Sequence, residues 1–221
     1  MTTMDGTKAT ELSTKYPLGV RIAEGKTKTI HSVSSNPNLA LIISKNDITA
    51  GDGAKHDVIP DKGAYSNKTT CNVFRLLAAC GVPVAFLEQD SPNSFVAPMC
   101  TMLPYEVIVR REAHGSYLKR NPHLAKGQLF PKLLVEFFLK TKDKVWKEHP
   151  LVCDDPFMIF HFGRREVELY NPAIPIHGQK PFLILPASKV FTADDEWKLF
   201  PKMEEIATQT FLVLERAWQL E

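Results

Sequence analysis

Two lysines near the start of the chain have types and spacing suited to binding a polyphosphate. They are Lys26 and Lys28, within the segment EGKTK at residues 24–28. If residues 20–30 form one strand bent at Gly25, alternate side chains share a face. The two ammonium groups then lie about 7 Å apart, given the rise per residue of a strand. A solvated edge strand is the alternative, because lysines also protect sheet edges.

A second cluster packs acidic residues, glycines and a lysine into residues 46–55. Asp47 and Asp52 could present carboxylates to an amine, and the glycines could expose backbone N–H groups to an anion. An ordinary turn is the alternative, because Gly and Asp both favour turns. The acidic spacing does not match an EF-hand, since no Glu closes a loop of about 12 residues.

A third cluster is basic and follows an apolar stretch, at residues 110–120. Arg110 could offer a bidentate fork to a phosphate or carboxylate. Gly115 and Ser116 could supply backbone N–H and hydroxyl donors. Taken alone, the cluster could equally be a basic surface turn, with His114 as an ordinary loop histidine.

Together the three clusters resemble the SAICAR synthetase family, the phosphoribosylaminoimidazole-succinocarboxamide synthases of purine biosynthesis. These sequence segments are similar to those of the synthetase domain of the animal bifunctional enzyme. The matching segments occur in family order between residues 20 and 140, with a looser match at DP 155–156. They are EGKTK at 24–28, ND and TAGD at 46–52, KG at 62–63, NK at 67–68, PYE at 104–106, RR, GS and KR within 110–120, and FFLK at 137–140.

This resemblance implies an ATP-dependent ligase that joins L-aspartate to the carboxylate of carboxyaminoimidazole ribonucleotide. The carboxylate is first phosphorylated, and the amine then displaces phosphate to give SAICAR. Implied cofactors are ATP and Mg²⁺, and implied partners are small molecules: ATP, aspartate and the imidazole ribonucleotide. The implied roles are ATP phosphates for Lys26 and Lys28, adenine for Met102, Leu103 and Glu106, substrate binding for Arg110, Ser116 and Asp52, and catalysis for Asp47 and Lys140.

The pattern of elements that must position these residues predicts an α+β fold with two lobes. We expect a leader at residues 1–17, an ATP-binding lobe at 18–103 and a second lobe at 104–221. The resemblance implies a SAICAR-synthase-like, ATP-grasp-related fold. Helices are predicted at 65–80 and 196–220, a long ordered loop at 46–63, strands at 20–30, 39–44, 82–86, 95–103 and 105–111, an apolar stretch of open type at 133–139, and a hairpin pairing 166–170 with 182–185.

The end of the chain departs from the family pattern. In the family, more chain follows a helix like that at 196–220 and carries the metal carboxylates, so we expect a C-terminally incomplete fold with no assigned metal ligands. Glu166 and Glu168 share a strand face and could in principle bind a metal. Paired surface glutamates, however, are usually only solvated. An exposed stripe on the last helix, including Trp218, would favour a homo-oligomer. Two alternatives stay open: an impaired nucleotide-binding or regulatory form, and a small-molecule kinase.

Composition limits the classes of protein to which the chain could belong. Among 221 residues, 44% are apolar and 24% charged, which are ordinary globular values. The net charge is only +2, so a nucleic-acid partner is not expected. No apolar run approaches the roughly 18 residues of a membrane span, and residues 1–15 lack a signal-like apolar core, so we expect a cytoplasmic protein. The cysteines show no zinc spacing and are expected to be reduced packing residues: Cys71, Cys80, Cys100 and Cys153.

Overall fold

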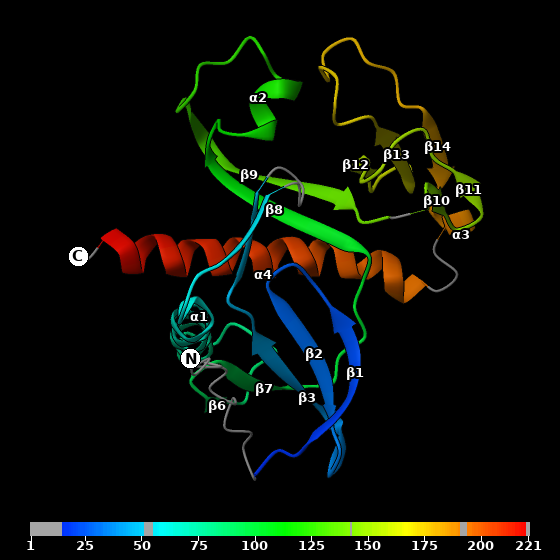
Figure 1. Ribbon diagram of the computed structural model, residues 1–221. Helices are drawn as coiled ribbons and strands as arrows, with labels where there is room; N and C mark the ends of the chain where they lie inside the picture. Colours follow the sequence, from blue (N-terminus) through cyan, green and yellow to red (C-terminus); the bar gives the residue numbers. More distant parts are fainter. Residues whose placement is uncertain (1–14, 51–54, 142, 191–193, 220–221) are drawn as a thin grey trace. The chain divides into compact units, whose positions relative to one another are not determined.

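The computed structural model describes residues 15–50, 55–141, 143–190 and 194–219 (Figure 1). Contacts divide the chain into two units, Met1–Thr101 and Met102–Glu221. Each unit combines a mainly antiparallel sheet with helices, so the α+β prediction is confirmed. Most of the expected leader lies outside the described residues. The assignment of ATP binding to the first lobe stays a prediction.

The first unit is a five-stranded antiparallel sheet with helix α1 (Lys62–Ala79) against one face. The sheet order is β1-β2-β3-β7-β6. Helix α1 confirms the predicted helix, and it begins a few residues earlier than expected. The strands are β1 (Leu18–Glu24), β2 (Lys28–Val33), β3 (Asn36–Ser44), β6 (Glu88–Ser91) and β7 (Ser94–Pro98).

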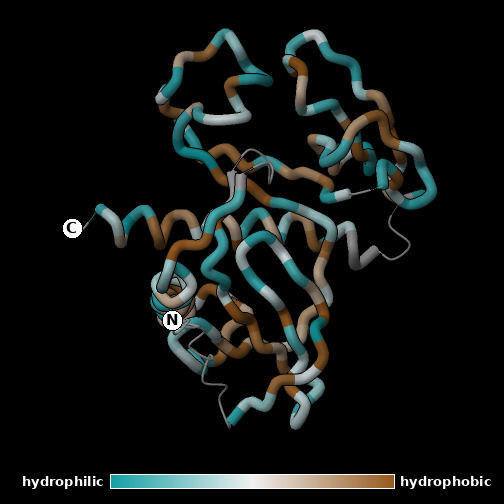
Figure 2. The backbone as a smooth tube through the Cα atoms, in the orientation of Figure 1, coloured by the Kyte–Doolittle hydropathy of each residue, from teal (hydrophilic) through white to brown (hydrophobic). Residues whose placement is uncertain are grey.

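Both faces of this sheet are apolar at its centre. Ile42 and Phe95 pack with the fully buried Cys71 of α1. Leu41 and Val96, one position along each strand, join a separate cluster, because successive side chains of a strand point to opposite faces. Figure 2 shows the resulting hydrophobic run along β3. Burial on both faces accounts for the unbroken apolar sequence that predicted a strand at residues 39–44.

Residues 20–30 form a hairpin, so the prediction of one bent strand is wrong. Strand β1 ends at Glu24 and β2 begins at Lys28. The Gly25 N–H donates to the Lys28 carbonyl at 2.8 Å and closes the turn. Lys26 therefore lies in the turn and Lys28 opens the next strand, and the two lysines do not share one face of one strand. A glycine within a polar run favours such a reversal.

Other local predictions in this unit also need correction. Residues 46–63 are not a continuous loop, because they contain the hairpin β4 (Asp47–Ala50) and β5 (Lys55–Val58). No strand occurs at residues 82–86, and β6 begins instead at Glu88. Strand β7 ends at Pro98 rather than near residue 103, since proline has no N–H to donate to a ladder.

The second unit is another five-stranded antiparallel sheet, ordered β14-β13-β12-β9-β8. The predicted hairpin is confirmed as β13 and β14, and the apolar stretch at 133–139 is the end of β9. Figure 1 shows α4 along one side of β8 and β9, with α2 on the other side. The elements are β8 (Tyr105–Glu112), α2 (Ser116–Arg120), β9 (Leu129–Leu139), β10 (Val145–Trp146), β11 (His149–Pro150), β12 (Phe157–His161), β13 (Glu166–Tyr170), β14 (Leu183–Pro186), α3 (Ala187–Val190) and α4 (Asp194–Gln219).

An aromatic core joins α4 to this second sheet. Phe200 is 1% exposed, and its ring lies 4.9 Å from Tyr105 and 5.8 Å from Phe137, measured between centroids. The predicted helix is confirmed as α4, and its most buried residues, Trp197 and Phe200, lie in its N-terminal part. Trp218, near the C-terminal end of α4, is exposed.

Candidate active site

The charged residues predicted for the second unit share one face of the β8–β9 ribbon. Glu106 lies opposite Phe138, and Arg110 lies opposite Leu134. Directly paired residues of antiparallel strands project to the same side, and so do residues two apart. The ladder continues through the Lys140 N–H, which donates to the Pro104 carbonyl at 2.8 Å. Helix α4 packs on the opposite face, so it leaves this one to α2 and its loop.

A buried carboxylate joins two arginines on this face. Arg110 Nε donates to Glu136 Oε2 at 2.7 Å, and Arg120 Nη2 donates to Glu136 Oε1 at 2.5 Å. Glu136 and Arg120 are 3% and 2% exposed, whereas the Arg110 side chain is 15% exposed. The Arg120 guanidinium also lies over the rings of Phe138 and Phe157, at 4.9 and 5.4 Å. Arg120 is therefore enclosed, and Arg110 is the cation nearest solvent.

The same two arginines hold the loop that carries the predicted phosphate ligand Ser116. Arg110 Nη1 donates to the His114 carbonyl at 3.3 Å, and Arg120 Nη1 donates to the Ser116 carbonyl at 3.3 Å. Gly115 has φ 59° and ψ −135°, a conformation open essentially to glycine alone. The structure thus places Arg110 beside the loop that carries the exposed Ser116, and their role in phosphate binding stays a prediction.

Lys140 lies beside two carboxylates. Its Nζ is 2.6 Å from Asp155 Oδ2 and 3.3 Å from Glu106 Oε2. The hydrogen bond to Asp155, with a smaller contribution from Glu106, raises the pKa of Lys140 above its usual value, against the opposing effect of burial. Lys140 is consequently a cation at neutral pH and suits charge stabilisation better than proton abstraction.

The segment predicted to lie beside adenine precedes β8. Met102 and Leu103 are 84% and 36% exposed, and Glu106 contacts Lys140. Exposed apolar side chains next to a charged pair are compatible with a purine, but that role stays a prediction.

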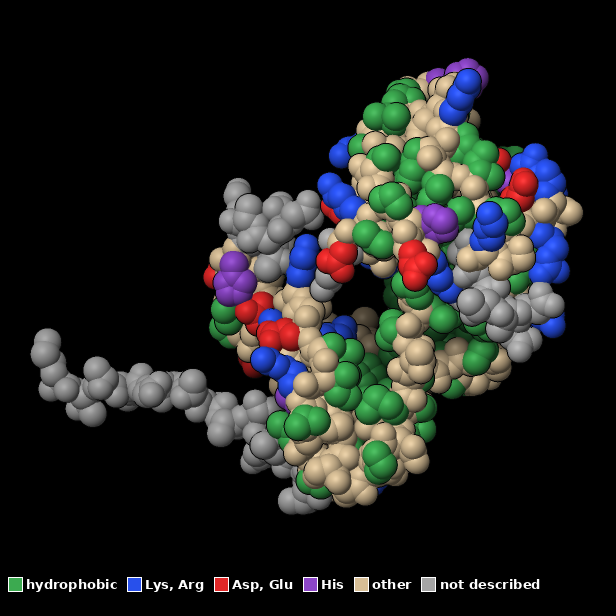
Figure 3. Space-filling view, turned by 90° about the vertical axis from the view of Figure 1, so that its right-hand side faces the viewer, with side chains coloured by type: hydrophobic (Ala, Val, Ile, Leu, Met, Phe, Trp, Pro, Cys, Tyr) green, Lys and Arg blue, Asp and Glu red, His purple; other side chains and the backbone are tan. Residues whose placement is uncertain are grey.

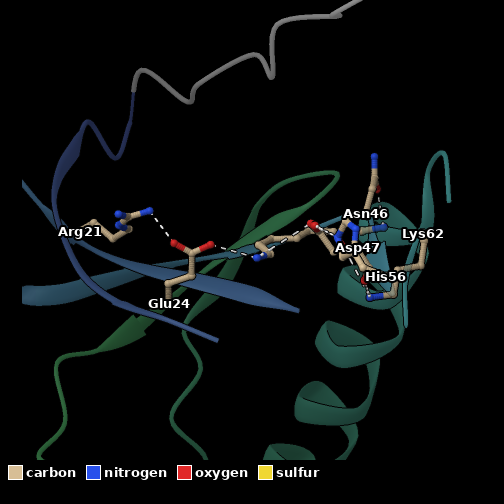
Figure 4. A network of polar contacts seen from close by, with 8 residues as sticks. Arg21, Glu24, Asn46, Asp47, His56 and Lys62 are labelled. Atoms are coloured by element: carbon tan, nitrogen blue, oxygen red, sulfur yellow. Dashed lines mark hydrogen bonds and ion pairs between the residues drawn. The ribbon is translucent and has the colours of Figure 1, made fainter. Parts of the chain in front are cut away.

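In the first unit, Asp47 is the centre of a polar network (Figure 4). Its Oδ1 lies 2.7 Å from His56 Nε2, across the β4–β5 hairpin. Lys45 Nζ lies 4.0 Å from Asp47 Oδ2 and 3.0 Å from Glu24 Oε1. The hydrogen bond from His56, aided by Lys45 and opposed by burial, lowers the pKa of Asp47. The carboxylate is therefore ionised at neutral pH.

Backbone contacts tie this hairpin to the start of α1. Lys62 Nζ donates to the Asp47 carbonyl at 2.9 Å, and the Gly63 N–H donates to Asn46 Oδ1 at 2.8 Å. A Cβ at Gly63 would lie 2.7 Å from the Ser44 carbonyl oxygen, so a side chain there would force the strand and helix apart. The segments ND and KG therefore act as one structural unit.

The other predicted residues of the first unit are less defined. Lys26 is exposed in the β1–β2 turn, and Lys28 is half-buried at the start of β2. Asp52 lies outside the described residues. Sequence reasoning missed Lys45, His56, Glu136 and Arg120; only the position of Arg120 within the KR segment signalled it.

Magnesium is not supported by a ligand cluster in the described residues, where no group of three or more His, Cys, Asp or Glu side chains could hold a metal ion. The carboxylates of Glu166 and Glu168 are instead engaged by Arg164, at 3.0 and 3.2 Å. Glu168 also lies 2.9 Å from His161 Nε2 and accepts from the Tyr170 hydroxyl at 2.7 Å. These partners satisfy the two carboxylates without a metal ion.

The structure also bears on the prediction that the cysteines are packing residues. All four cysteines are free, but Cys80 and Cys100 are exposed, so the prediction that all four pack internally is wrong.

In the part of the chain that the structure describes, no helix is long and apolar enough to cross a membrane. On the face drawn in Figure 3, basic side chains lie among acidic and apolar ones.

Several known proteins are similar to this chain in sequence and in fold. The profile of the SAICAR synthetase family matches residues 21–166. A bifunctional purine synthesis protein of Dictyostelium discoideum is 40% identical over 198 residues, covering 90% of this chain and 17% of that protein. A phosphoribosylaminoimidazole-succinocarboxamide synthase of Roseiflexus sp. (strain RS-1) is 48% identical over 123 residues, covering 56% of this chain and 49% of that protein. A solved SAICAR synthetase in complex with ADP matches with a TM-score of 0.61 at 25% identity, covering 87% of this chain and 66% of that one.

The fold is that of the SAICAR synthetases, a mixed α+β class. The chain belongs to the SAICAR synthetase family, because the family profile covers well over half of it. This confirms the resemblance drawn from the residue clusters. The chain spans less than half the length of the two relatives described above.

Proposed function

We propose that this chain carries the ligase chemistry of its family, joining L-aspartate to the carboxylate of carboxyaminoimidazole ribonucleotide at the expense of ATP. The observation that carries the proposal is the family match across residues 21–166, which includes every predicted site residue. Phosphorylation converts the unreactive carboxylate into an acyl phosphate. The aspartate amine then attacks the acyl carbon, forms the C–N bond and releases phosphate.

In this proposal the second unit binds the ribonucleotide and neutralises charge. Arg110 and the Ser116 loop bind its phosphate, since a guanidinium beside hydroxyl and N–H donors matches phosphate oxygens. Lys140 stabilises negative charge on the transferring phosphoryl group or substrate carboxylate. Such stabilisation needs a fixed cation, and the contacts of Lys140 with Asp155 and Glu106 hold one in place.

The first unit is proposed to bind ATP and to present a carboxylate. Lys26 and Lys28 contact the ATP phosphates from the β1–β2 turn, and Asp47 orients the incoming amine. Residues 102–106, which belong to the second unit, are separately proposed to contact the purine. The ADP complex of the related SAICAR synthetase supports nucleotide binding. When bound, Mg²⁺ would supply positive charge that neutralises the ATP phosphates, and the steps proposed for this chain depend on its own side chains. A cytoplasmic location follows from the proposed substrates.

The test is ADP release by the purified chain supplied with ATP, Mg²⁺ and the ribonucleotide, with and without L-aspartate. We expect release that depends on aspartate and is accompanied by SAICAR, identified by mass spectrometry. ADP release that ignores aspartate would favour the small-molecule kinase. Binding of ATP and ribonucleotide without turnover would favour the impaired nucleotide-binding form.

A further inference from the structure

We propose that Glu136, itself held by Arg120, is a positioning residue that aims Arg110 at the phosphate of the ribonucleotide. The inference rests on the proposed function and deepens it, because it explains how one partly buried arginine is held in a geometry that recognises phosphate. Glu136 is only 3% exposed and is not expected to touch the ligand. Its effect on binding must therefore pass through Arg110.

The geometry of the contacts leaves the phosphate-binding edge of Arg110 available. Glu136 accepts from Nε, and the His114 carbonyl accepts one N–H of Nη1. The N–H groups of Nη2 and the second one of Nη1 receive no acceptor from the described residues. A bidentate contact to a phosphate needs two parallel N–H groups. Glu136 binds the Nε–H, and the phosphate would bind the N–H groups of Nη1 and Nη2, so the two contacts do not compete.

The charges of the cluster point the same way. Two guanidinium groups share one carboxylate, so the cluster retains a net positive charge. Arg120 is 2% exposed and lies between the rings of Phe138 and Phe157; its charge is satisfied by Glu136 and by the Ser116 carbonyl. The uncompensated charge therefore resides on Arg110, at the solvent-facing end. An anion bound there completes the charge balance of a largely buried group.

Arg120 and Glu136 also restrict the ligand loop. Because Arg120 donates to the Ser116 carbonyl, the same buried pair fixes the positions of Ser116 and of Arg110. Preorganisation of both groups reduces the ordering that binding would otherwise require. Loss of the Glu136 carboxylate would free the Arg110 side chain without removing it.

The experiment compares two probes, aminoimidazole carboxamide ribonucleotide and the matching riboside that lacks the phosphate. Calorimetric titration of the full chain measures both affinities, and their ratio isolates the phosphate contribution. We expect Arg110→Lys to reduce this ratio. We expect Glu136→Gln to reduce it by about tenfold, the scale at which contacts supporting a ligating side chain act. The riboside affinity and the ATP affinity should not change, which a general loss of structure would not allow.

Glu215→Gln is the matched control, because Glu215 pairs with the neighbouring Arg111 at 2.7 Å but on the α4 side of β8. It should leave the ribonucleotide-to-riboside ratio unchanged. Glu136→Asp, which retains the charge, should recover part of the ratio. Should Glu136→Gln fail to fold, as judged by circular dichroism, the double variant Glu136→Gln/Arg120→Met removes the unpaired buried cation and carries the same expectation.

The coupling between variants decides the inference. If Glu136 acts through Arg110, the variant Arg110→Lys/Glu136→Gln binds no more weakly than Arg110→Lys alone. Additive losses, or an unchanged ratio in Glu136→Gln while Arg110→Lys is impaired, would overturn the positioning role and leave the proposed function standing. A wild-type chain that binds ribonucleotide and riboside equally would overturn the phosphate site and, with it, both proposals.

Discussion

Arg110 and Arg111 are consecutive on β8, and their guanidinium groups pair with carboxylates on opposite faces of the sheet. Arg110 donates through Nε to Glu136 on β9. Arg111 makes a fork-like pair with Glu215 on α4, through Nε and Nη2 at 2.8 and 2.7 Å. The fork of Arg111 is thus fully used inside the unit. Arg110 is the one of the two that retains N–H groups for a ligand.

The two carboxylates on either side of β8 should differ sharply in their contribution to stability. Glu136→Ala leaves Arg120 buried without its partner, which typically costs about 3–5 kcal/mol. Glu215→Ala breaks a partly exposed pair and should cost much less, because solvent screens the two charges. Urea unfolding followed by tryptophan fluorescence measures both, since Trp146, Trp197 and Trp218 all belong to the second unit. Equal losses would contradict the burial of Glu136.

The lysines of the first hairpin should bind ATP. Lys26→Ala or Lys28→Ala should each weaken ATP binding by roughly 1.5–3 kcal/mol, the range for a hydrogen bond to a charged group. Calorimetric titration with ATP measures the change, and Lys180→Ala, an exposed lysine of the second unit, serves as the control. If both hairpin variants bind ATP like the wild type, these lysines are solvated residues of an edge turn.

Lys140 should matter for turnover far more than for folding. Lys140→Gln removes a fixed cation and should lower kcat by about 10²-fold, the scale for loss of one preorganised electrostatic contact. The pairs with Asp155 and Glu106 are half-exposed, so stability should change by less than about 1 kcal/mol. The ADP-release assay and a thermal melt separate these effects. Asp155→Asn should give a smaller loss of kcat; a variant as active as wild type would exclude this role for Lys140.

Tyr170 should make the fold sensitive to alkaline pH. Burial, together with the hydrogen bond to Glu168, raises the pKa of Tyr170 to about 12, whereas an unfolded tyrosine titrates near about 10. Between these values the unfolded chain releases a proton that the folded chain retains, so the free energy of unfolding falls as pH rises. Below about pH 10 the contribution of Tyr170 is fully present.

The measurement is urea unfolding at several pH values between neutral and strongly alkaline, with tyrosinate absorbance recorded on the folded chain. Tyr170→Phe should be less stable than wild type at neutral pH and should show a shallower alkaline decline. A decline of identical slope in the two proteins would mean that other groups control the alkaline transition.

Local patterns in the sequence were sufficient for the long elements. The helical period of apolar residues predicted α1 and α4, because this pattern reflects burial on one side of an element. A Pro- and Gly-containing loop between two segments predicted the hairpin of β13 and β14. The β1–β2 reversal and the β4–β5 hairpin were missed. The β1–β2 reversal was missed because its two strands are separated by only three residues, so that the sequence reads as one strand. Strands β4 and β5 have four residues each and are largely polar, and pairing with each other, rather than local preference, makes them strands.

For the site, residue types and their order along the chain were enough to identify the family and the side chains capable of its chemistry, among them Asp47, Arg110 and Lys140. The partner that each of these side chains contacts depends on the fold. Glu136 reads in the sequence as one polar residue within an apolar strand, and His56 as part of a turn. Strand register places Glu136 beside Arg110, and burial makes their pairing obligatory, since an unpaired charge in that position would cost far more than the contact itself returns.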